Sequence, residues 1–244
     1  LCILAVGLIA MPLNLKWQDS LIIGKNIVTT KNHKLYDLAL RDKPLTPVIA
    51  YGSAGVGKTY GAVGAAIEWL DKHKHNKVMV TRPNVSFAKE SGYLPGTERE
   101  KMEPWVRPIQ QNFVANGANK GRQESWEKHG NLVYMPLEFI QGLTFDNTFI
   151  IVDECQNMTF QQLKVFLTRT GKWSKVVLCG DIAQISPKFR GSGLAELIQM
   201  IDYFNLNVHT IEFTRDDILR SEQCKAWIEA FDAWENLPTI SQGS

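Results

Sequence analysis

The sequence predicts an α/β fold in which a mostly parallel sheet is flanked by helices. Short apolar runs rich in β-branched residues alternate with longer segments whose apolar residues recur at helical spacing. A glycine-rich turn, GSAGVGKT at residues 52–59, joins one such run to one such segment. This alternation is typical of parallel strands connected by crossover helices.

Six runs are predicted to be strands, and four segments are predicted to be helices. The strands are expected at residues 48–51, 77–81, 132–135, 148–152, 175–179 and 208–212. The helices are expected at residues 58–72, 161–170, 194–204 and 221–234. No repeat or long linker divides the series, so one domain is expected.

An insertion after the second strand, residues 83–130, interrupts the alternation. A structureless loop of that length is uncommon in a compact domain, so we expect a helix at 98–114 and a flexible stretch at 116–122. Excursions at strand ends often form substrate surfaces.

Composition narrows the class of protein without naming a partner. Of 244 residues, 44% are hydrophobic and 21% charged, as in ordinary globular domains, and the net charge of +2 neither favours nor excludes nucleic acid. The four cysteines form no CxxC pair, so neither a metal site nor a disulfide framework is expected. We expect a cytoplasmic protein. Residues 1–30 are expected to be an N-terminal extension, whose apolar start at residues 1–10 is too short to span a membrane.

The glycine-rich turn has the spacing G-x-x-x-x-G-K-[ST] between a predicted strand and a predicted helix. Its backbone N–H groups can curve around a phosphate at the positive end of the helix. Lys58 is expected to reach the β- and γ-phosphates of ATP as a catalytic residue, and the Thr59 hydroxyl is expected to hold Mg²⁺. The predicted nucleotide-binding residues here are Gly52, Ser53, Ala54, Gly55, Val56, Gly57, Lys58, Thr59 and Tyr60.

Two adjacent carboxylates follow the predicted strand at 148–152. Asp153 is expected to bind Mg²⁺, and Glu154 is expected to polarise the attacking water. Gln184 follows the next strand and is the candidate catalytic residue that senses the γ-phosphate. A solvated glutamine in a strand-ending turn is the alternative reading.

These residues together resemble the PhoH family of P-loop ATPases, relatives of the RecA-like core of superfamily-one helicases. The resemblance covers about residues 32–231, with the motifs in the family's order. The matching stretches are TRP at 81–83, GYLPG at 92–96, DECQN at 153–157, FLTR at 166–169, GDIAQ at 180–184, SGL at 192–194 and DDILRS at 216–221.

The resemblance implies a single RecA-like PhoH ATPase domain over residues 31–240. It also implies that the strand before Gln184 lies between the phosphate-loop strand and the Asp153 strand. Family members are ATPases often linked to RNA metabolism and are similar in form to ring-assembling proteins. RNA or single-stranded DNA is therefore an expected partner, and a homo-oligomer is expected, with a hexameric ring favoured.

The sequence departs from the family at three places. His33 stands where the family has a glutamine that can read adenine, so His33 is a candidate base contact and strict preference for ATP is in doubt. QGLT at residues 141–144 replaces a pattern close to RGRT and lacks its arginines. Residues 116–130 are longer than usual.

Arg220, at the start of the last predicted helix, is a candidate catalytic arginine finger that reaches the ATP of a neighbouring subunit. A solvated arginine at a helix start is the alternative, and Arg190 and Arg215 are the reserve candidates. Arg82 could contact a nucleic-acid backbone. The insertion interleaves basic residues with Tyr93, Trp105, Phe113 and Trp126, which suits single-stranded nucleic acid, although such aromatic residues also anchor insertions to a core.

Two functions remain open at this point. One is an ATPase coupled to movement on, or remodelling of, RNA or single-stranded DNA, with helicase-like activity requiring an oligomer. The other is an oligomeric interaction protein, gated by nucleotide, that unwinds nothing.

Overall fold

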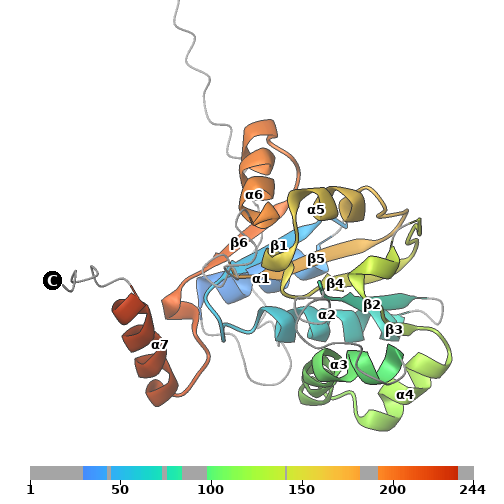
Figure 1. Ribbon diagram of the computed structural model, residues 1–244. Coiled ribbons are helices and arrows are strands. Elements are labelled where there is room, and N and C mark those ends of the chain that lie inside the picture. Colours follow the sequence, from blue (N-terminus) through green and yellow to red (C-terminus); the bar gives the residue numbers. More distant parts are fainter. Residues whose placement is uncertain are drawn as a thin grey trace, which may run out of the picture.

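The computed structural model describes residues 30–42, 45–72, 76–83, 98–140, 142–181 and 192–235. Six parallel strands form one sheet in the order β3-β2-β4-β5-β1-β6 (Figure 1). Their bounds are β1 Val48–Gly52, β2 Lys77–Thr81, β3 Leu132–Tyr134, β4 Thr148–Val152, β5 Lys175–Gly180 and β6 His209–Phe213. The predicted fold class is confirmed, and β5 lies between β4 and β1 as the resemblance implied.

Helices cover both faces of the sheet (Figure 1). Their bounds are α1 Lys31–Arg41, α2 Lys58–Lys72, α3 Glu98–Ala115, α4 Lys120–Lys128, α5 Phe160–Leu167, α6 Gly193–Phe204 and α7 Glu222–Glu235. Because side chains alternate along a strand, Val48 and Ala50 of β1 pack in one core with α1, α2 and α3, while Ile49 packs in the other with α5 and α6. None of the described helices is both long and apolar enough to cross a bilayer.

The insertion is helical where a helix was predicted, but the expectation of a flexible stretch at 116–122 is wrong. A turn with Gly117 at φ 92° ends α3, and Asn119 then caps α4 because its side chain accepts a hydrogen bond from the Arg122 N–H. Helix α1 was not predicted. It begins after Thr30, whose side chain accepts from the His33 N–H, and buries Tyr36, Ala39 and Leu40.

The aromatic residues of the insertion mostly anchor it to the core. Phe113 is fully buried, Trp105 packs edge-on against Tyr134, and Trp126 packs against Phe113. The expectation that Phe113 could stack on nucleic-acid bases is therefore wrong. Tyr93 and the GYLPG stretch lie outside the described residues, as do the N-terminal extension up to residue 29, Arg190 and Gln184.

Candidate nucleotide-binding site

The motif residues meet at the carboxyl edge of the sheet, where β1, β2, β4 and β5 all end. This edge is where open parallel sheets bind ligands. A cavity of about 300 Å³ lies there, lined by the phosphate loop, Asp153, Glu154, Asp181 and Arg220. A larger cavity, about 1030 Å³, lies at the opposite edge near Lys77 and Asn147 and contains none of the motif residues. Size therefore does not identify the site, whereas the motif chemistry does.

The loop between β1 and α2 has the conformation that its glycines predict. Gly52, Gly55 and Gly57 have φ values of 115°, 77° and 83°, a region that side-chain-bearing residues rarely adopt. At Gly52 a Cβ would also collide with the Phe213 carbonyl at the end of β6. The Ser53 N–H donates to that carbonyl at 3.3 Å. The loop is thus fixed against the neighbouring strand.

Lys58 is folded onto its own loop. Its Nζ donates to the carbonyls of Gly52 and Ser53 at 2.8 and 2.7 Å. Burial lowers the pKa of Lys58, and the Asp181 carboxylate opposes that shift. Tyr36 Oη, from α1, donates to the Lys58 carbonyl at 2.8 Å and supports the start of α2. An ammonium group held inside the loop is placed to meet phosphate oxygens.

Thr59 and Asp153 come together as predicted. The Thr59 hydroxyl donates to Asp153 Oδ1 at 2.7 Å, which links α2 to the end of β4. Burial raises the pKa of Asp153, while Thr59 and Arg82 oppose the shift. A hydroxyl and a carboxylate are oxygen ligands of the kind Mg²⁺ takes, so these residues fit such an ion. Within the described ranges no three His, Cys, Asp or Glu residues gather as a metal cluster, and Mg²⁺ commonly completes its shell with water and substrate phosphates.

Glu154 occupies the left-handed region at φ 54°, which residues with a side chain seldom adopt. The Gln156 amide nitrogen donates to Glu154 Oε2 at 2.6 Å, and the Gln156 amide oxygen accepts from the Asp181 N–H at 3.0 Å. Gln156 is 1% exposed. It links the carboxylate after β4 to the end of β5, a role that sequence reasoning did not assign, although Gln156 lies in the DECQN stretch.

Arg82, just after β2, faces both carboxylates. Its guanidinium nitrogens lie 3.8 Å from Asp153 Oδ2 and 3.9 Å from Glu154 Oε1. The structure therefore brings Arg82, which the sequence suggested only as a nucleic-acid contact, beside the predicted metal ligand Asp153 and the predicted catalytic residue Glu154.

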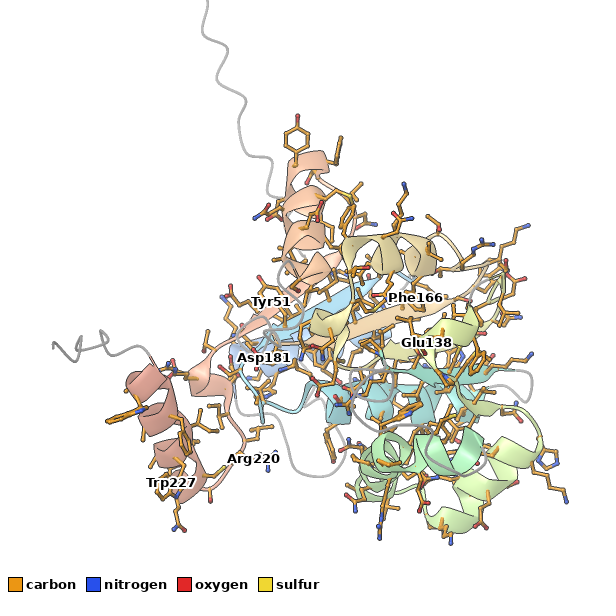
Figure 2. The ribbon with its side chains drawn as sticks, viewed as in Figure 1. Tyr51, Glu138, Phe166, Asp181, Arg220 and Trp227 are labelled. Atoms are coloured by element: carbon orange, nitrogen blue, oxygen red, sulfur yellow. The ribbon has the colours of Figure 1, made fainter. Side chains whose placement is uncertain are left out.

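Arg220 lies over the phosphate loop of its own chain. The Leu219 N–H donates to the Gly55 carbonyl at 3.1 Å, and Arg220 lines the same cavity as Lys58. Figure 2 labels Arg220 and Asp181, two of the residues that line this cavity. The expectation that Arg220 reaches the ATP of a neighbouring subunit stays a prediction, since the structure describes one chain. Within that chain Arg220 lies beside its own phosphate loop. Arg220 is exposed, and no described carboxylate forms an ion pair with it.

His33 supports the loop. It is 6% exposed; its Nε2 donates to the Val56 carbonyl at 2.8 Å, and its Nδ1 lies 2.8 Å from Thr30 Oγ1. Thr30 in turn donates to Asp217, just ahead of Arg220. Both ring nitrogens are engaged, so His33 presents no free nitrogen to a base in this arrangement.

Sequence comparison with known proteins finds one family model and several relatives that carry the same family description. A family model described as PhoH-like protein matches residues 27–232. A PhoH-like protein of Bacillus subtilis is 36% identical over 211 residues, 86% of this chain and 65% of that protein. Protein PhoH of Escherichia coli is 33% identical over 198 residues, 80% of this chain and 55% of that protein. The chain thus spans 65% or less of the length of these two curated relatives.

A solved structure agrees with this fold. The large terminase of a thermophilic bacteriophage, in complex with ADP, superposes with a TM-score of 0.53 over 82% of this chain and 49% of that chain, at 16% identity. A likeness at this identity shows the fold alone, which is that of a RecA-like P-loop NTPase.

Proposed function

We propose that this chain, which belongs to the PhoH-like protein family, hydrolyses ATP with Mg²⁺ at the site formed by Lys58, Asp153 and Glu154. Family and fold support nucleotide hydrolysis in general. ATP as the nucleotide, Mg²⁺ as the ion and single-stranded nucleic acid as the partner are the further content of the proposal. The observation that carries it is the 2.7 Å hydrogen bond between Thr59 and Asp153, which brings the two halves of the site together from distant parts of the chain.

Each residue of this site has a separate role in the attack of water on the γ-phosphate. Lys58 leaves the Gly52 and Ser53 carbonyls and binds phosphate oxygens, while Thr59 and Asp153 would hold Mg²⁺. When bound, Mg²⁺ would supply positive charge that neutralises the phosphate oxygens. Glu154, aimed by its left-handed backbone and by Gln156, orients the attacking water and accepts its proton.

Arg220 supplies a second positive charge from the same chain. Its side chain packs on Gly55 at the mouth of the cavity, where charge on the γ-phosphate needs a partner beyond Lys58. Gln184 stays a proposed sensor of the γ-phosphate, because it follows β5 shortly after Asp181, which lines the cavity.

Self-association is a second proposal, and it rests on helix α7 rather than on Arg220. Three large aromatic side chains of α7 are exposed: Trp227, Phe231 and Trp234 at 61%, 61% and 75% (Figure 2 labels Trp227). Trp227 and Phe231 stack on each other. An exposed aromatic face of this kind favours a protein contact, as a homo-oligomeric ring would provide.

The test of the proposal is phosphate release by the purified chain from ATP and from GTP, with and without Mg²⁺. Mg²⁺-dependent release that Lys58→Ala abolishes is the expected result. Folded protein that binds neither nucleotide would refute the proposal. Mass in solution, with and without a non-hydrolysable ATP analogue, tests self-association separately.

A further inference from the structure

The two carboxylate oxygens of Glu154 contact different kinds of group, one neutral and one positively charged. Oε2 accepts a 2.6 Å hydrogen bond from the neutral amide of Gln156. Oε1 faces the charged guanidinium of Arg82 at 3.9 Å. One oxygen is therefore fixed by a hydrogen bond, and the other is only attracted by a nearby cation.

These two contacts differ in how easily they break. Gln156 is buried, and its amide oxygen is tied to the Asp181 N–H, so it cannot turn away without leaving polar atoms unpaired. The Arg82 side chain is 31% exposed, and both of its carboxylate distances exceed that of a hydrogen bond. Partly exposed ion pairs contribute little free energy, so a stronger anion can displace this one.

Release of Arg82 would change what Glu154 can do. While the guanidinium lies beside Oε1, its charge is shared between Glu154 and Asp153, and it competes with water for that oxygen. Once Arg82 leaves, Gln156 still holds Oε2, and the backbone at φ 54° still directs the side chain. Oε1 is then open to the attacking water.

Arg82 also stands where a polyanion can reach it. It follows β2 at the carboxyl edge of the sheet, at the point where the chain leaves for its insertion. A guanidinium group binds phosphate through two parallel hydrogen bonds, a stronger contact than the loose pairs it makes here.

We infer that Arg82 is a positioning residue that couples binding of a single-stranded nucleic-acid backbone to ATP hydrolysis. A backbone phosphate pairs with Arg82 and withdraws it from Glu154 and Asp153, which frees Glu154 for water. The inference rests on the proposed ATPase function and adds the residue through which a partner stimulates it.

The experiment compares wild type with Arg82→Gln and Arg82→Lys, measuring kcat and KM for ATP with and without poly(U) RNA or oligo(dT). In Arg82→Gln, kcat without nucleic acid should rise roughly three- to fivefold, as expected for loss of a weak ion pair, and stimulation should disappear. KM for ATP should change little. Arg82→Lys should keep low basal activity and part of the stimulation.

Controls separate this mechanism from a folding defect and from failure of the proposed function. Lys164→Gln, on the exposed side of α5 and away from the cavity, should leave kcat and stimulation unchanged. Thermal unfolding should show that Arg82→Gln is folded. A basal kcat that falls in Arg82→Gln would overturn the inference, because Arg82 would then serve the γ-phosphate of ATP itself. Wild type that hydrolyses ATP without stimulation by either polymer would also overturn it while leaving the proposed function standing.

Discussion

Arg220 packs against Gly55 of its own phosphate loop, so closely that a Cβ on Gly55 would lie 2.9 Å from Arg220 Nε. The neighbouring backbone hydrogen bond from Leu219 to the Gly55 carbonyl fixes this approach. If Arg220 acts in the site of its own chain, mixing two different inactive mutants in one oligomer should not restore activity.

Mixtures of Arg220→Ala and Lys58→Ala subunits should remain inactive. Each chain then lacks one of two cations needed in the same site, and no neighbour can restore it. Arginines in this role are worth about 10³–10⁵ in rate where known, so Arg220→Ala alone should lose most activity. Phosphate release after verified co-assembly is the measurement, with wild type mixed with Lys58→Ala as the control. Recovery of activity in the double mixture would show that Arg220 acts between subunits.

Gly55→Ala should weaken nucleotide binding and lower the melting temperature. Alanine is strained at φ 77°, at a cost of about 1 kcal/mol, and its methyl group would displace Arg220. Gly121→Ala in α4 is the matched control, because the nearest atom to its Cβ would be 3.7 Å away. Equal ATP affinity in Gly55→Ala and wild type would argue against a close contact between Arg220 and the loop.

His33→Ala should raise KM for ATP and GTP by similar factors and leave the preference between them unchanged. The imidazole holds the Val56 carbonyl in the loop that binds phosphates, which both nucleotides share. Competition between the two nucleotides measures the preference. If a preference for ATP vanished in this variant alone, His33 would be a base contact after all.

Much of the fold could be predicted from the sequence, because helices, strands and turns are specified by residues close together in the chain. The bounds of α2, β2 and β4 agree with their predicted ranges, and the phosphate loop needed only its glycines, lysine and flanking elements. Asp153 could be expected near Thr59 from the sequence, because the carboxyl ends of parallel strands lie at one edge of the sheet.

The relationships that sequence reasoning missed depend on tertiary packing. The position of Arg220 is set by a hydrogen bond between Leu219 and Gly55, and no local pattern encodes that approach. Gln156 acts through a bond to the end of another strand. The burial of Phe113 likewise depends on how the insertion folds back onto the core, which its mixture of basic and aromatic residues does not reveal.

Lys175 should make the protein more stable as pH rises above 8. It is fully buried at the start of β5, where its Nζ donates to the Ala39 carbonyl, and burial lowers its pKa to about 8, against an opposing effect of Asp42. Between that value and the unfolded pKa near 10.4, the unfolded chain binds more protons, so the free energy of unfolding increases with pH. The increase should be on the order of 2–3 kcal/mol across this window.

Urea unfolding of wild type and Lys175→Met at pH 7.5 to 10 measures this slope. The difference between the two proteins should shift in favour of wild type as pH rises, and exposed Lys172→Met should show no such shift. Parallel curves for wild type and Lys175→Met would show that Lys175 does not titrate in this range.

The most direct test of the account is ATP hydrolysis and ATP binding measured side by side in Glu154→Gln. The glutamine side chain keeps the size of the residue and removes the base, so ATP should bind with near-normal affinity while turnover falls by about 10²–10⁴. Trapped, unhydrolysed ATP on a folded protein is the predicted result. Turnover close to that of wild type would contradict the assignment of Glu154 and, with it, the mechanism proposed for this site.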